Sequence, residues 1–202
     1  DIKVAAEQSS SLDIYTVSGA GGIAGVSGAF SDGVIDNTTR AYVEGGTSTA
    51  TAATLDAGGE TVVSATSTEE ITTGTGSAAG GGVGVAGAVG VKVVTSETTA
   101  EIGSFTKVNQ TRRGGASQDV QVAATDTVRL AGGGGSGAFG AYGAGATAEI
   151  NVVRNTTTAS IGNHAIVRAD NDIGVDATSP KDVQSAAVAA AGGASAGIAG
   201  AV

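Results

Sequence analysis

Acidic side chains are the residues of this chain whose type and spacing could do chemistry. Glu69 and Glu70 are adjacent, and Glu97 and Glu101 lie four positions apart. Two carboxylates on either side of a scissile bond are the usual catalytic pair of glycosidases. The acidic positions here follow a sequence repeat, however, and aromatic residues that could stack on sugars make up only 3% of the chain. We therefore predict no catalytic residue, and we keep a carbohydrate-active β-helix enzyme as an alternative.

The chain offers even fewer residues for metal binding or nucleophilic catalysis. His164 is the single histidine and there is no cysteine, so a two-histidine metal site cannot form. A Ser-His-Asp arrangement through His164 would lack the nucleophile-elbow motif, and we expect an exposed turn residue there. Two acidic pairs could hold calcium at a coil corner, although solvated turn residues explain them more simply: Asp32 with Asp36, and Asp170 with Asp172. We predict no metal and no cofactor.

Glycine motifs that resemble nucleotide-binding fingerprints occur twice, as Gly82-x-Gly84-x-x-Gly87 and Gly135-x-Gly137-x-x-Gly140. The fingerprint requires a following helix, and the sequence offers none. No lysine follows a glycine, which excludes a phosphate-binding loop. The run from Gly132 to Gly137 also lacks the aspartate of calcium-binding glycine repeats.

Three sequons begin at Asn37, Asn109 and Asn155. Asparagine and threonine side chains can bond to nearby backbone, so we expect these segments to form turns at solenoid corners.

The composition indicates a regular, thin interior. Of 202 residues, 35 are glycine and one is proline, and the 41% that are hydrophobic are mostly Ala, Val and Ile. This is too apolar for a disordered chain. The net charge of −9, with Arg112-Arg113 as the sole basic pair, argues against a nucleic-acid partner.

An internal repeat organises the whole sequence. An acidic–apolar–x–Val–x–Ala motif opens each unit, and it begins at Asp1, Glu60, Asp119 and Asp172. The offsets are 60 − 1 = 59, 119 − 60 = 59 and 172 − 119 = 53. A Gly/Ala-rich block follows each opener, and a Thr-Thr motif follows the first three blocks. The units are residues 1–59, 60–118, 119–171 and an incomplete 172–202.

Alternation with period two, as in Asp119-Val120-Gln121-Val122-Ala123, predicts strands throughout. We expect residues 1–202 to form a single elongated, all-β parallel solenoid. Because solenoid coils usually have about 20–30 residues, each repeat should contain two or three coils. The opener residues Val4, Val63, Val122 and Val175, with Ile2, Val120 and Ile173, should stack inside. Gly84, Gly87, Gly137 and Gly140 should lie in strands and face another sheet or coil at short range.

The two ends look cut from a longer chain. Asp1 opens directly into a strand pattern with no signal peptide, and the uncharged stretch Val183 to Val202 is too rich in glycine and alanine for a membrane span. Uncapped solenoid ends should pair with coaxial copies.

The Gly/Ala block leading into Asn-Thr-Thr-x-Ala, followed by the acidic opener, resembles repeats of large secreted bacterial proteins. The likeness is to leukotoxin-type filamentous adhesins, among proteins exported by two-partner secretion or autotransport. This resemblance implies a β-helical shaft, exposure at the cell surface or secretion, and binding to host-cell or bacterial surface receptors. We expect a structural or adhesive segment, not an enzyme; a self-assembling extracellular fibre subunit is the other alternative.

Overall fold

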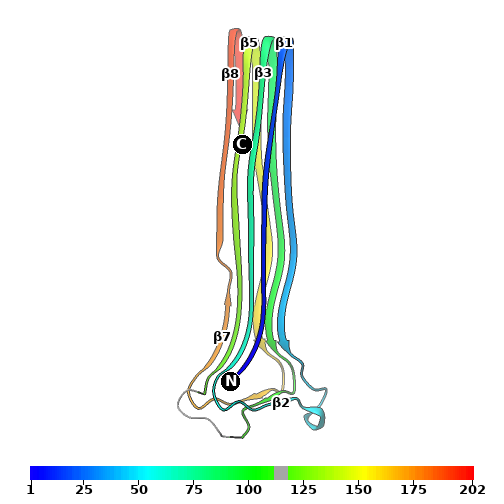
Figure 1. Ribbon diagram of the computed structural model, residues 1–202, viewed down its shortest axis with the longest axis vertical. Helices are drawn as coiled ribbons and strands as arrows, with labels where there is room; N and C mark the ends of the chain where they lie inside the picture. The colour runs from blue at the N-terminus through cyan, green and yellow to red at the C-terminus, as the bar shows by residue number, and fades with distance from the viewer. Residues whose placement is uncertain (112–117) are drawn as a thin grey trace.

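The computed structural model describes residues 1–111 and 118–202, and the described chain is built almost wholly of parallel strands (Figure 1). Three strands of 42 residues dominate it. They are β1 (Ile2–Val43), β3 (Thr61–Ile102) and β5 (Val120–Ile161). The others are β2 (Thr54–Leu55), β4 (Lys107–Val108), β6 (Ile166–Val167), β7 (Ile173–Thr178) and β8 (Lys181–Ala201), with a 3₁₀ turn η1 (Thr49–Thr51). The predicted all-β parallel solenoid is confirmed. The segment from Arg112 to Ser117, predicted to be a variable loop, lies outside the described residues.

Each long strand rises, reverses at a distal tip and descends beside itself (Figure 1). In β1 the rising arm is residues 2–22 and the descending arm is residues 23–43. The hydroxyls of Ser18 and Ser27 meet at 2.8 Å across the two arms. Gly22 and Gly81 take φ values of 139° and 150° at the reversal, a region of backbone conformation that only glycine enters readily.

One repeat forms one coil, so the expectation of two or three coils per repeat is wrong. Ile2 pairs with Thr61 and Thr61 with Val120, and the same 59-residue offset persists to Val43 and Ile102. The prediction failed because ordinary strands have about 5–6 residues, whereas each arm here has about 20. The short strands β2, β4 and β6 form a second parallel sheet that closes each coil at the base. The molecule is therefore long in the strand direction, across the stacking axis (Figure 1).

The opener residues stack in line along the coils, as predicted, and Val120 is fully buried. Ile173 is 49% exposed, so the prediction of an interior position is wrong for the last coil. Val4, Val63, Val122 and Val175 are register partners in that order. Val63 and Val122 are fully buried, while Val175 is 45% exposed at the outermost described coil. Opener aspartates bridge the coils at their base: Asp1 accepts a hydrogen bond from the backbone of Glu60, and Asp119 accepts one from the backbone of Asp172, both at 2.9 Å. This bonding gives the acidic first position of the motif a physical role.

A column of glycines lets the two arms approach near the tip. Gly25, Gly84, Gly143 and Gly197 are register partners at the start of the descending arms. A Cβ on Gly84 would lie 2.8 Å from the carbonyl oxygen of Phe139 in the next coil. Side-chain atoms are thus excluded where backbone faces backbone.

The glycine prediction is confirmed for Gly84 and Gly140 and is wrong for Gly87 and Gly137. A Cβ on Gly140 would overlap the backbone of Gly81. Gly87 points outward, with its nearest neighbour 3.9 Å from the Cβ position, and the nearest neighbour of Gly137 is the ring of Phe139. Alternation explains the difference, because only every second residue of an arm faces inward.

The glycine column predicts a sharp contrast between two alanine substitutions. Gly84→Ala should lower the urea midpoint of unfolding because its methyl would press on backbone that cannot rotate away. Gly87→Ala, three residues along the same arm, should leave the midpoint nearly unchanged. Equal losses in the two variants would contradict the packing described at the tip.

The stacked openers make a second prediction. Val122→Asp should cost several kcal/mol because it buries a carboxylate with no partner. Gln121→Asp places the same side chain on the outer face and should be tolerated. Chemical denaturation of both variants checks this, and equal stability would mean that Val122 does not belong to the interior.

Candidate functional site: polar layers inside the solenoid

The interior alternates between apolar and polar layers along the arms. One apolar layer near the base contains Val63, Ile102 and Val122. A second contains Ile71, Val94 and Leu130, and a small cluster of Ala79, Ala86 and Ala138 fills the tip. Ionisable side chains occupy the spaces between these layers, and they are the most unusual groups in the described chain.

The first polar layer brings two carboxyl groups together. Glu69 of the second coil and Asp126 of the third are both fully buried, and Asp126 precedes Val128, the register partner of Glu69, by two residues. Ser67 and Asn37 donate hydrogen bonds to Glu69 Oε1, the latter at 3.2 Å. Ser96 donates to Asp126 Oδ2 at 2.5 Å.

Burial raises the pKa of Glu69 above its ordinary value of 4.5. Removing a carboxylate from water disfavours the charged form, and this is the largest cause. The nearby Asp126 side chain and its negative charge act in the same direction, whereas the hydrogen bonds from Ser67 and Asn37 lower the pKa of Glu69.

The second polar layer holds an ion pair between the same two coils. Lys92 Nζ lies 2.7 Å from Glu149 Oε2, and the side chains are 0% and 2% exposed. Lys92 also donates to Thr73 Oγ1 at 2.8 Å. Glycines provide the space: a Cβ on Gly132 would overlap Lys92 Nζ, and one on Gly90 would overlap the Glu149 carboxylate.

The acidic residues singled out from sequence do not converge. Glu69 is buried, whereas Glu70 is exposed on the outer face of the rising arm. Glu97 and Glu101 point out from the descending arm. The four carboxylates therefore lie on opposite faces or inside, and no common cleft holds them.

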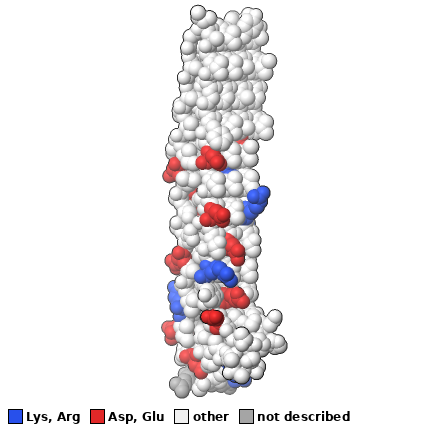
Figure 2. Space-filling model, turned by 90° about the vertical axis from the view of Figure 1, so that its right-hand side faces the viewer, with Lys and Arg blue, Asp and Glu red and all other residues white. Residues whose placement is uncertain are grey.

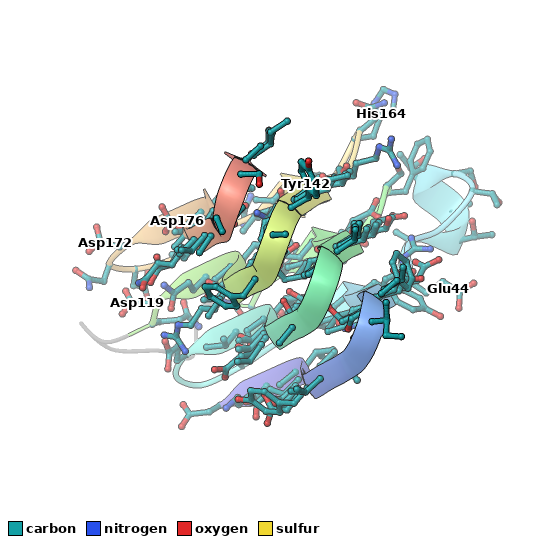
Figure 3. All side chains as sticks on the ribbon, turned by 90° about the horizontal axis from the view of Figure 1, so that it is seen from above. Glu44, Asp119, Tyr142, His164, Asp172 and Asp176 are labelled. Carbon is teal, nitrogen blue, oxygen red and sulfur yellow. The ribbon has the colours of Figure 1, made fainter. Side chains whose placement is uncertain are left out.

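The other candidates are scattered too. As expected, His164 is an exposed turn residue. It has φ of 59°, and its ring stacks on that of Phe105. Figure 3 shows it on the opposite side of the base from Asp119 and Asp172. Asp32 and Asp36 lie within β1, not at a corner. Within residues 1–111 and 118–202, no group of three or more His, Cys, Asp or Glu is placed to hold a metal ion.

Of the three sequons, only the one at Asn109 lies at a corner. Asn109 has φ of 54°, accepts a bond from the backbone of Ala57 at 2.9 Å and donates to the carbonyl of Arg168 at 3.2 Å. The corner prediction is wrong for Asn37 and Asn155, which lie inside the long strands β1 and β5. Turn propensity was overridden there by in-register pairing with neighbouring coils.

Charged residues lie in the half of each arm that is nearer the base of the molecule, as Figure 2 shows on one face. No charged residue occurs between Asp13 and Asp32, between Glu70 and Lys92, between Arg129 and Glu149, or after Asp182. These four stretches surround the tip in successive coils. The half of the molecule around the tip therefore carries no charged side chain in these four stretches.

Among the residues that the structure describes, no helix has the length and apolarity to span a membrane. No protein-family model, curated protein or solved structure matches the chain.

The ion pair predicts non-additive substitutions. Lys92→Met should destabilise the chain by about 3–5 kcal/mol because it leaves a buried carboxylate uncompensated. Adding Glu149→Gln to Lys92→Met should recover most of that loss. A double-mutant cycle measured by urea unfolding checks this, and additive effects would mean that the two groups act separately.

Proposed function

We propose that this chain is a structural repeat segment of a bacterial surface or secreted filamentous protein, without catalytic activity. The observation that carries the proposal is the unbroken 59-residue register from β1 to β5. Each coil leaves its inner layers open on two sides, and neighbouring coils cover them. Such a unit is stable only as part of a stack, and a stack of any length can be built from it.

The surface supports a structural role more than a catalytic one. Five surface hollows of the described chain have volumes of about 170–400 Å³. The most buried charged groups serve contacts between coils. The resemblance to filamentous adhesins agrees with a shaft that presents binding surfaces to host-cell or bacterial receptors.

A self-assembling fibre subunit is the second candidate, favoured by the sheet order. The strands run β1-β3-β5-β7, with β8 also paired to β5. The outer edge of β1 therefore offers unpaired backbone groups on which a copy could dock coaxially. Sedimentation over a range of concentrations distinguishes the two: strings that lengthen with concentration favour the fibre subunit, and a constant monomer favours the segment.

The main proposal predicts where the parent protein is found. Antibodies raised against the purified chain should label intact, unpermeabilised cells of the organism that makes it, or its culture medium. Beads coated with the chain should bind host cells or bacteria more than beads coated with a heat-unfolded sample. Labelling seen only after permeabilisation would overturn the proposal, as would turnover of a polysaccharide by the purified chain.

A further inference from the structure

Glu69 and Asp126 are buried carboxyl groups on adjacent coils, and Asp126 precedes Val128, the register partner of Glu69, by two residues. Both side chains are fully buried. The buried cation, Lys92, is engaged by Glu149 in a separate layer. The layer of Ile71, Val94 and Leu130 lies between the two polar layers.

Each of these carboxyl groups has one satisfied and one unsatisfied oxygen. Glu69 Oε1 and Asp126 Oδ2 accept hydrogen bonds from hydroxyl or amide donors. Glu69 Oε2 and Asp126 Oδ1 are buried with no hydrogen-bond partner. A buried polar atom without a partner destabilises the folded chain, and two ionised carboxylates close together also repel each other. One hydrogen atom between the groups would remove both penalties, because a short O–H···O⁻ bond is among the strongest in proteins.

We propose that Glu69 and Asp126 bind a single proton between them at neutral pH, as an acid–carboxylate pair that fastens the second coil to the third. The structure thus contains a proton-binding site at a coil boundary. The inference concerns the stacking of coils and is independent of whether the parent protein is an adhesin.

The side chains around the pair identify the shared proton as the source of the proposed pH dependence. From β1, Ser10 is the register partner of Glu69 and Asn37 donates to it. From β5, Val128 is its register partner and Asp126 is the single ionisable neighbour. From β3 itself, Ser67 and Ser96 donate to the pair. The serine, asparagine and valine side chains among these neighbours carry no ionisable group.

The direction of the pH effect follows from the raised pKa of Glu69, caused first by burial and then by Asp126. The folded chain holds this proton at pH values where the unfolded chain has released it. Its contribution to stability is therefore complete below about pH 4.5, the ordinary value, and falls as the pH rises towards the folded-state pKa. Ionisation of the pair loosens the boundary between the two coils.

The test uses Glu69→Gln, since a glutamine amide keeps the shape of the protonated acid and can donate to Asp126 at every pH. Urea midpoints are measured from pH 4 to pH 9 for the native chain and for this variant. The midpoint of the native chain should fall relative to that of Glu69→Gln as the pH rises, and the variant should be at least as stable at pH 8. Glu70→Gln, one residue away on the outer face, is the matched control and should follow the native curve.

Infrared spectroscopy at pH 7 supplies a direct readout. A protonated-acid carbonyl band should be present in the native chain and in Glu70→Gln, and absent in Glu69→Gln. Parallel pH curves for native chain and Glu69→Gln, or a missing band in the native chain, would overturn the proposal. So would stabilisation by calcium chloride that EDTA reverses and Glu69→Gln abolishes, because a metal ion would then occupy the place of the proton.

Discussion

In-register parallel pairing is the constraint on which everything else in this molecule depends. Because side chains alternate across a strand, a slip of one residue would turn every inward side chain outward. The 59-residue offset holds along all of β1 and β3. Each interior layer is therefore built from the same few inward positions of successive coils, and a residue is tolerated inside only if its inward neighbours in the adjacent coils complement it. The glycine column at Gly84 and the valine column at Val122 are two outcomes of the same rule.

Much of this architecture could be predicted from sequence, since it depends on patterns repeated several times. The openers, the strands and the inward valines follow from the 59-residue offset and from period two. The number of coils per repeat could not be predicted in the same way. The alternating pattern does not indicate at which residue an arm reverses. The reversal at Gly81 lies within a run rich in glycine, so no single glycine there marks the turn.

The polar layers show the same limit in finer detail. Val63 faces inward, so parity places Glu69 inward and Glu70 outward, and that much was available from the sequence. After the reversal the inward positions change from odd to even numbers, as the buried Lys92 and Val94 show. If the position of the tip is unknown, the sequence predicts that Lys92, which lies between valines, is exposed to solvent. Its partner Glu149, 57 residues away, becomes a neighbour only through the stacking of coils.

The buried ion pair has a consequence for how a nearly periodic chain avoids mistakes during folding. Hydrogen-bond register alone would accept the first coil against the third with the second looped out. In that arrangement Gly33, the register partner of Lys92, would take its place beside Glu149, and the carboxylate would be sealed inside with no cation. The backbone hydrogen bonds would form equally well in this misfolded arrangement, whereas the unpaired buried carboxylate would destabilise it. The ion pair therefore favours the correct order of coils whose backbones would otherwise pair equally well.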